Sequence, residues 1–210
     1  MKDAMKKADV LIEALPYIQQ FRGEIVVIKF GGSAMEEKTH FNGVLADVTF
    51  MECVGMLPLI VHGGGKAISK GTKEHGIEPK FLKGLRVTCE KTIQVVQEVL
   101  NNEINPAIVA TLERMGAKAQ SMQGENVYTA KRKLEIDEKT GEKLDLGFVG
   151  EPEQVDIKPI KNLLYRDIIP VVTPLGRGVD GKLYNMNADT AAAARPITSS
   201  LFAMKQYANA

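Results

Sequence analysis

Two segments of the chain combine glycines with a cationic residue, a pairing that suits the binding of phosphate. The first reads KFGGS from Lys29, the second reads HGGGK from His62, and each follows a short apolar run. Glycines let backbone N–H groups approach an anion closely, and a lysine side chain adds a positive charge. Three glycines between a strand and a helix also leave unpaired N–H groups at the helix N-terminus. The sequence therefore predicts an anion or phosphoryl site beside Lys29. Its glycines are Gly31, Gly32, Gly63, Gly64 and Gly65.

Neither glycine segment fits the two common nucleotide-binding fingerprints. A Walker A loop would need a glycine where Ile60 stands and a serine or threonine where Ala67 stands. No G-x-G-x-x-G spacing fits the dinucleotide motif either. The alternative for the first segment is a lysine that leaves a strand into solvent beside an ordinary turn. A tight turn with close packing of helix on strand would account for one glycine of the second segment, but not for three.

Three further residues could hold a substrate. Arg86 directly precedes a long helical segment, and its guanidinium could hold a carboxylate through two hydrogen bonds, although a lone arginine is often solvated. Asn185 and Asp189 are four residues apart and would share a face if a helix began near Asn185. Asp189 could instead only complement the dipole of that helix. The three histidines are scattered, and their spacing predicts neither a metal site nor a catalytic triad.

The elements around the glycine segments repeat the order strand, glycine loop, helix. Strands are predicted at 24–30 and 57–62, and helices at 38–53 and 66–75. This order is typical of a parallel sheet with crossover helices, and such sheets bind ligands at the carboxyl ends of their strands. The fold class predicted is therefore α/β, with three layers (α/β/α) around a mainly parallel open sheet.

The two ends and the second half of the chain contain further elements. Residues 8–21 predict a helix that Pro16 should kink or split, either covering the domain or packing on another subunit. Helical spacing over 88–115 is interrupted by Pro106, which predicts a kink or break near Asn105. The remaining predictions are a strand at 118–122, a hairpin of 127–136 and 143–149 around a turn at 139–141, a helix at 155–164, a strand at 167–174, a hairpin turn at 179–182, and a helix at 187–194 capped by Asn187.

Composition narrows the class of protein. The 210 residues are 44% hydrophobic and 25% charged, with a net charge of +1, which excludes intrinsic disorder and argues against nucleic-acid binding through bulk charge. Two cysteines, Cys53 and Cys89, exclude a disulfide scaffold and a cysteine-rich zinc site. No apolar stretch approaches the roughly 20 residues of a membrane span, and the N-terminus lacks the pattern of a secretory signal. We therefore expect a cytoplasmic protein with no membrane or nucleic-acid partner.

Together, five segments resemble the amino acid kinase family in order and spacing, from about Ala8 to Ala194. They are KFGGSAM (29–35), LPLIVHGGG (57–65), FLKGLRVT (81–88), DLGFVGE (145–151) and YNMNADTAAAA (184–194). Within the family, the resemblance is to the phosphotransferases that phosphorylate the side-chain carboxylate of N-acetyl-L-glutamate with ATP and Mg²⁺, a step of arginine biosynthesis. The acceptor carboxylate has a pKa of about 4.3 and is already ionised at neutral pH, so no general base is needed. That agrees with the lack of a positioned histidine in the sequence.

The resemblance implies a role for each candidate residue. Lys29 would stabilise the transferring phosphoryl group, and Asp189 would orient the catalytic lysines. Gly31, Gly32 and Gly63 would form the phosphoryl-binding loops. The substrate would be held by Gly64, Gly65, Arg86 and Asn185, under a lid made of the 127–149 hairpin.

The resemblance also implies a domain organisation. Residues 1–22 would be a helical arm, similar to the arm of members that form arginine-inhibited hexamers, so we expect a homo-oligomer, either a dimer or a hexamer. Residues 23–194 would be the substrate-binding lobe. Residues 195–210 diverge: Arg195-Pro196 should break the last helix, and the tail shows no buried-strand pattern and no glycine loop. We expect no nucleotide-binding lobe from this tail, and impaired phosphorylation by the chain alone.

Two alternative functions remain open from the sequence. One is a non-catalytic module that binds an acyl amino acid or serves assembly. The other is a different amino acid kinase, such as a glutamate 5-kinase or a carbamate kinase. The GLRVT and NMNAD segments favour the kinases of N-acetyl-L-glutamate over this second alternative.

Overall fold

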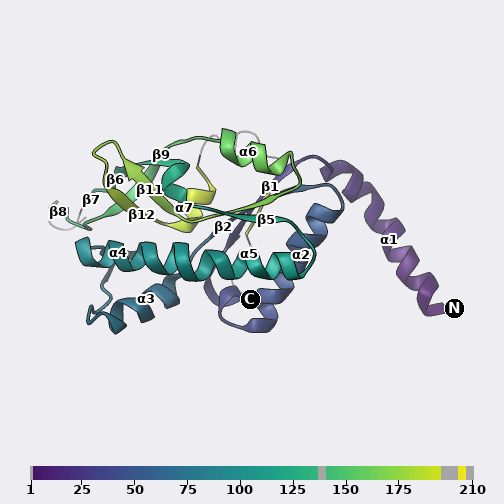
Figure 1. The fold of residues 1–210 in the computed structure, drawn as a ribbon, viewed down its shortest axis with the longest axis horizontal. Coiled ribbons are helices and arrows are strands. Elements are labelled where there is room, and N and C mark those ends of the chain that lie inside the picture. Colours follow the sequence, from purple (N-terminus) through teal and green to yellow (C-terminus); the bar gives the residue numbers. More distant parts are fainter. Residues whose placement is uncertain (1, 137–140, 195–202, 207–210) are drawn as a thin grey trace.

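A computed structural model describes residues 2–136, 141–194 and 203–206, and a parallel sheet lies at its centre (Figure 1). The five strands of this sheet all pair in parallel. In spatial order they are β13 (Ala203–Gln206), β1 (Ile25–Phe30), β2 (Leu57–His62), β10 (Ile169–Val172) and β5 (Ala119–Met122). The buried, apolar runs expected of parallel strands form β1, β2 and β10, and the predicted α/β class is confirmed.

Helices cover both faces of the sheet (Figure 1). On one face, α2 (Lys38–Cys53) and α5 (Asn105–Arg114) pack on buried side chains of β1, β2 and β10. On the other, α6 (Lys158–Leu164) and α7 (Ala188–Ala192) close a second apolar cluster. A third cluster joins α3 (Gly65–Glu74) to α4 (Glu90–Glu98). The three layers place both glycine loops at the carboxyl edge of the sheet.

The register of β1 and β2 brings the two glycine loops together. Lys29 pairs with Val61, and Phe30 pairs with His62, so both strands end at the same level. The Gly63 N–H then donates to the Phe30 carbonyl over 2.7 Å, which joins the start of the second loop to the end of β1. The first loop continues into a short 3-10 helix, η1 (Gly32–Met35).

A small closed barrel stands beside the sheet and was not predicted. It is formed by four strands, β6 (Tyr128–Arg132), β9 (Val149–Val155), β11 (Leu175–Gly178) and β12 (Leu183–Met186). The sequence predicted the hairpin of β11 and β12 from its turn at 179–182, but it paired 127–136 with 143–149, whereas β6 pairs with β9. Parallel pairs, Arg177 to Thr129 and Asn185 to Val149, close the two hairpins into the barrel. This closure leaves the four short strands without an open edge.

Two shorter hairpins and a 3-10 turn complete the described elements. The hairpins are β3 (Phe81–Leu82) with β4 (Leu85–Arg86), and β7 (Glu135–Ile136) with β8 (Lys143–Leu144), and the 3-10 turn is η3 (Gly124–Asn126). The pairing of β7 with β8 supports the predicted 127–149 hairpin. Most of its predicted turn at 139–141 lies outside the described residues.

The structure contradicts the split predicted at Pro16 and the break predicted near Asn105. The N-terminal helix α1 (Lys2–Phe21) begins earlier than predicted and runs through Pro16 as one element. The carbonyl that loses its helical donor belongs to Ile12, whose exposed position lets water replace the bond. Near Pro106 the chain stays helical, because a π turn, η2 (Val99–Ile104), joins α4 to α5. The Asn105 N–H donates to the Leu100 carbonyl five residues back, and Pro106 is placed in the first turn of α5.

Two other expectations also need correction. The tail was expected to contain no strand, yet Ala203–Gln206 pairs in parallel with β1 and so covers an edge that would otherwise expose unpaired backbone groups. The helix expected at 155–164 begins only at Lys158, because Val155 still belongs to β9. Within the described part of the chain, no helix combines the length and apolar character needed to cross a membrane.

Candidate functional site

A cavity of about 220 Å³ opens at the carboxyl edge of β1 and β2. All the residues singled out from the sequence line it, although they come from distant parts of the chain. They are Lys29, Gly31, Gly32, Gly63, Gly64, Gly65, Arg86, Asn185 and Asp189. The structure therefore brings the candidate residues together, while the role of each stays a prediction.

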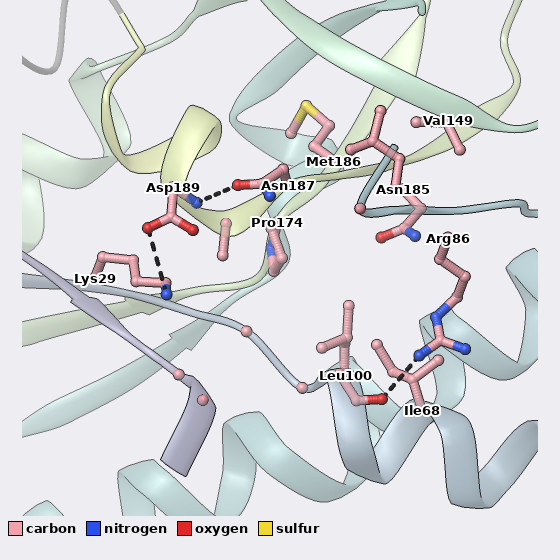
Figure 2. A pocket seen from close by; sticks show the side chains of 18 of the residues that line it. Lys29, Ile68, Arg86, Leu100, Val149, Pro174, Asn185, Met186, Asn187 and Asp189 are labelled. Atoms are coloured by element: carbon pink, nitrogen blue, oxygen red, sulfur yellow. Dashed lines mark hydrogen bonds and ion pairs between the residues drawn. The ribbon is translucent and has the colours of Figure 1, made fainter. Parts of the chain in front are cut away.

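One end of the cavity carries an ion pair. The Lys29 Nζ lies 3.3 Å from Asp189 Oδ1, and the lysine side chain is only 16% exposed (Figure 2). Asp189 lies in the first turn of α7. The predicted cap is confirmed there, because the Asn187 side-chain oxygen accepts from the N–H groups of Asp189 and Thr190. The cap fixes Asp189, and Asp189 holds the lysine ammonium against the cavity. We call this the Lys29 end.

The second glycine loop forms the floor between the two ends. Gly64 immediately precedes α3, whose first N–H groups have no partner within the helix. A Cβ atom at Gly64 would lie 2.5 Å from Ile104 Cδ1 and 2.9 Å from Leu100 Cδ2. A side chain at this position would therefore force Ile104 and Leu100 of the π turn to move.

A buried pair of polar side chains lies beneath the same loop. His62 is fully buried, and burial lowers the pKa of its imidazole to about 4, so the ring is neutral. Its Nδ1 lies 2.9 Å from the Gly63 carbonyl, and its Nε2 lies 3.0 Å from Asn105 Nδ2. Sequence reasoning gave neither residue a role. The signals were a histidine directly before three glycines and an asparagine directly before a proline.

The opposite end of the cavity is built around Arg86, which we call the Arg86 end. Its side chain is buried, and its Nη2 donates to the Gly65 carbonyl at 2.8 Å and to Ser69 Oγ at 2.7 Å. The guanidinium lies 4.7 Å from the centre of the Phe81 ring, which the β3–β4 hairpin brings opposite. Burial lowers the pKa of Arg86, although a guanidinium stays protonated in proteins.

One donor of Arg86 is left for a ligand. The buried Nη1 has no hydrogen-bond partner among the described residues. A buried donor without a partner is costly, and a bound carboxylate would remove that cost. Ser69 and Phe81, which fix the guanidinium, were missed from the sequence because contacts between distant elements leave no local pattern.

Asn185 lies on the same side as Arg86, away from Lys29 and Asp189 (Figure 2). The shared helical face with Asp189, expected if a helix began near Asn185, does not form, because Asn185 belongs to β12 and α7 begins only at Ala188. Its Nδ2 donates to Thr88 Oγ1 at 3.4 Å, a long hydrogen bond. The barrel strand, and not a helix, thus places this amide at the Arg86 end.

The cavity suits an elongated anion with a charge at each end. Lys29 and the glycine N–H groups can stabilise one negative group, and Arg86 with Asn185 can bind a second. Among the described residues, no group of three or more histidine, cysteine or acidic side chains is placed to hold a metal ion.

Comparison with curated proteins finds acetylglutamate kinases. The enzyme of Caldanaerobacter subterraneus subsp. tengcongensis is 47% identical over 190 residues, which cover 90% of this chain and 62% of that protein. That of Symbiobacterium thermophilum is 44% identical over 195 residues, with coverages of 92% and 67%. That of Methanocaldococcus jannaschii is 43% identical over 197 residues, with coverages of 91% and 66%. The chain thus spans about two thirds of the length of these relatives.

Solved structures with a similar fold include N-acetylglutamate synthase from Neisseria gonorrhoeae complexed with coenzyme A and N-acetyl-glutamate. It is 26% identical with a TM-score of 0.73, covering 87% of this chain and 41% of that one. The protein smu.665 from Streptococcus mutans is 29% identical with a TM-score of 0.69, covering 81% and 66%. Carbamate kinase from Giardia, at 12% identity and a TM-score of 0.52, shares the fold alone.

The part of the chain that matches a family model contains the carboxyl ends of β1 and β2. Residues 24–195 match the amino acid kinase family, which is most of the chain and includes every candidate site residue. The resemblance noted in the sequence is confirmed, and the chain belongs to the amino acid kinase family.

Proposed function

We propose that the cavity binds N-acetyl-L-glutamate and that the chain serves the ATP-dependent phosphorylation of its side-chain carboxylate. The observation that carries this proposal is the separation of two cationic residues, Lys29 and Arg86, at opposite sides of one cavity (Figure 2). N-acetyl-L-glutamate has a carboxylate at each end. In the proposed pose the α-carboxylate is bound by Arg86 and Asn185, and the side-chain carboxylate lies near Lys29.

The chemistry proposed at the Lys29 end is phosphoryl transfer. An oxygen of the ionised side-chain carboxylate bonds to the γ-phosphorus of ATP as the bond from that phosphorus to the bridging oxygen breaks, which gives an acyl phosphate and ADP. No proton moves, since the carboxylate is already ionised at neutral pH. Lys29 and the glycine N–H groups would stabilise the charge on the phosphoryl oxygens, with Asp189 orienting the lysine.

Features of the loops fit a phosphoryl group. Gly64 and Gly65 line the cavity without a side chain, and Gly65 begins α3, whose first N–H groups have no partner within the helix. Mg²⁺, when bound with ATP, would neutralise phosphate charge. The relatives named acetylglutamate kinase support this assignment and, with it, a place in arginine biosynthesis.

A non-catalytic binding module is a second candidate. It is favoured by the structural likeness to an N-acetylglutamate synthase, a protein of different activity that was solved with N-acetyl-glutamate. Both candidates require the cavity to bind N-acetyl-L-glutamate. Only the first requires an acyl phosphate to form.

Calorimetry on the 210-residue chain tests the binding that both candidates share. We expect N-acetyl-L-glutamate to bind the unchanged protein, and Arg86→Ala to weaken binding by a few kcal/mol, as for a lost charge-assisted pair. Arg166→Ala is the matched control, because Arg166 is an exposed arginine outside the cavity. Equal affinity in the unchanged protein and Arg86→Ala would contradict the assignment of Arg86.

Trapping with hydroxylamine then separates the two candidates. Formation of hydroxamate that needs ATP and Mg²⁺, and that is lost in Lys29→Ala, supports the kinase. Binding of N-acetyl-L-glutamate without any hydroxamate is the result expected of the binding module, and also of a kinase chain whose phosphorylation is impaired.

The exposed apolar side chains of α1 support a homo-oligomer as a further part of the proposal. Figure 1 shows α1 extending away from the rest of the molecule. Its exposed large residues are Val10, Leu11, Ile12, Leu15 and Tyr17. These exposed side chains would be covered if the projecting helix packed on another copy of the chain.

A further inference from the structure

The buried pair beneath the glycine loop, His62 and Asn105, has no part in the chemistry described so far. Both side chains are essentially inaccessible to solvent, with His62 at 0% and Asn105 at 1% exposure. Buried polar groups are costly unless their hydrogen bonds serve the fold or a site. His62 contacts the Gly63 carbonyl and Asn105 contacts His62, so both can affect the conformation of the loop that contains Gly64.

Donor and acceptor matching fixes the tautomer of His62. The Gly63 carbonyl can only accept, so the Nδ1 that faces it at 2.9 Å carries the proton. A neutral imidazole has one N–H, so Nε2 must accept, and Asn105 Nδ2 donates to it at 3.0 Å. The other hydrogen of that Asn105 amide goes to the Val171 carbonyl at 2.8 Å. Asn105 therefore ties the ring to β10 and sets which nitrogen is protonated.

The π turn is what places Asn105 there. Because the Asn105 N–H bonds to the Leu100 carbonyl, five residues back, the helix is wound more loosely just before α5. Leu100 and Ile104 of the same turn face Gly64. The π turn thus both packs against the loop at Gly64 and places Asn105 beneath that loop.

The hydrogen bond to His62 also sets the direction of the next N–H group. In a trans peptide the C=O of Gly63 and the N–H of Gly64 point in opposite directions. The Gly63 carbonyl points to the buried ring, and the Gly63 N–H is bonded to the Phe30 carbonyl at 2.7 Å. The Gly64 N–H must therefore point away from the ring, and Gly64 is one of the residues that line the cavity. Without these bonds, a run of three glycines has little steric preference for this orientation.

We propose that His62, held as the Nδ1–H tautomer by Asn105, is a positioning residue that aims the Gly64 N–H at the anion bound in the cavity. His62 does not touch the ligand. It acts by fixing one peptide plane before the ligand arrives, which removes the cost of ordering that plane on binding. The identity of the ligand, N-acetyl-L-glutamate, rests on the proposed function, whereas the orientation of the peptide does not.

Two measurements on the unchanged protein test the orientation. Nitrogen-15 NMR of the imidazole at neutral pH should show a protonated Nδ1 and an unprotonated Nε2. The Gly64 amide proton should shift downfield as N-acetyl-L-glutamate is added. If the calorimetry detects no binding, the proposed function fails, and inorganic phosphate serves as the probe of the Gly64 amide instead. An Nε2–H tautomer, or a Gly64 amide that responds to neither anion, would overturn the proposal.

Two substitutions at His62 distinguish a positioning role of this residue from a purely structural role. In His62→Asn the shorter amide can donate near the former Nδ1, so affinity for N-acetyl-L-glutamate should stay within about threefold. In His62→Gln the amide reaches past that point, so affinity should fall by about tenfold, the size of one hydrogen bond to a charged group. Near-ultraviolet circular dichroism and the amide spectrum show whether each variant is folded. Equal loss of affinity in both folded variants would mean a structural role only, and would contradict the proposal.

His75 provides the matched control. Its Nδ1 also lies beside a backbone carbonyl, that of Gly71 at 2.8 Å, but at the far end of α3 and outside the cavity. His75→Gln should leave the affinity unchanged. If His62→Gln does not fold, the tautomer and the Gly64 amide shift of the unchanged protein still decide the question.

Discussion

Arg86 and Lys29 carry the same charge but are held in different ways. Arg86 is buried, its Nη2 is bonded to Gly65 and Ser69, and its Nη1 has no partner among the described residues. Lys29 is held by a single ion pair to Asp189. A guanidinium held in one orientation suits recognition of a carboxylate. A compact ammonium group suits stabilisation of the charge that develops on a phosphoryl group. The side-chain geometry therefore agrees with the proposed division into a binding end and a reacting end.

The first residue-scale prediction concerns the shape of the cation at position 86. Arg86→Lys keeps the charge but cannot bond Gly65, Ser69 and a ligand at once, so N-acetyl-L-glutamate should bind at least about tenfold more weakly. Calorimetry measures the change, with Arg166→Lys as control. An affinity unaltered by Arg86→Lys would show that charge alone suffices.

The second prediction concerns the close contact at Gly64. Gly64→Ala places a Cβ against Ile104 and Leu100 and should lower the free energy of unfolding by about 1–3 kcal/mol. The neighbouring Gly65→Ala is the matched control, because a Cβ there meets nothing within 4 Å and should change stability by no more than about 0.5 kcal/mol. Urea unfolding compares them, and equal effects would contradict the packing described here.

The third prediction follows from the buried imidazole. The pKa of His62 is lowered from 6.5 to about 4, so between these pH values the unfolded chain binds a proton that the folded chain does not. The free energy of unfolding should therefore be fully retained above about pH 6.5 and should fall as the pH drops, by up to about 1.4 kcal/mol per pH unit. Urea unfolding at several pH values measures this slope. His62→Asn should flatten it, and an unchanged slope would mean that another group is responsible.

At the scale of elements, the sequence best predicted those strands, helices and loops that depend on a local pattern of residues. The runs before Gly31 and Gly63 form β1 and β2, and apolar spacing gave α2 with its observed bounds. The glycine loops could be recognised because three glycines in a row are not required by packing alone. These features already located the Lys29 end of the site.

What the sequence could not predict depends on contacts between distant residues. The barrel closes through the pairing of Arg177 with Thr129, which no local sequence pattern predicts. Pro106 suggested a break in the helix. The chain instead stays helical through the neighbouring π turn, which places Asn105 beside His62. The spacing of Asn185 and Asp189 would fit one helical face, but Asn185 lies in β12 and only Asp189 lies in α7.

The prediction at this scale concerns α1. If its exposed apolar side chains mediate assembly, the double variant Leu11→Glu and Leu15→Glu should shift the chain to a smaller species, because burying two carboxylates at an interface is costly. Sedimentation velocity measures the shift, with Glu13→Lys as control for a charge change on the same helix. Binding of N-acetyl-L-glutamate should not change, since α1 does not line the cavity. An unaltered sedimentation coefficient would contradict the proposal that α1 forms the interface between copies of the chain.

At the scale of the whole molecule, the central sheet, the barrel and the helices each supply one part of the site. The sheet edge gives Lys29 and the glycine loops, the β3–β4 hairpin gives Arg86, and the barrel gives Asn185. The family and its fold follow from the comparisons. The ligand is the part of the account that needs direct observation.

A crystal structure of the chain with N-acetyl-L-glutamate tests the central claim most directly. We expect the ligand in the cavity, with its α-carboxylate on Arg86 Nη1 and Asn185, and its side-chain carboxylate toward Lys29 and the Gly64 N–H. A ligand bound elsewhere, or one lying in the cavity with the two carboxylates exchanged, would contradict the account.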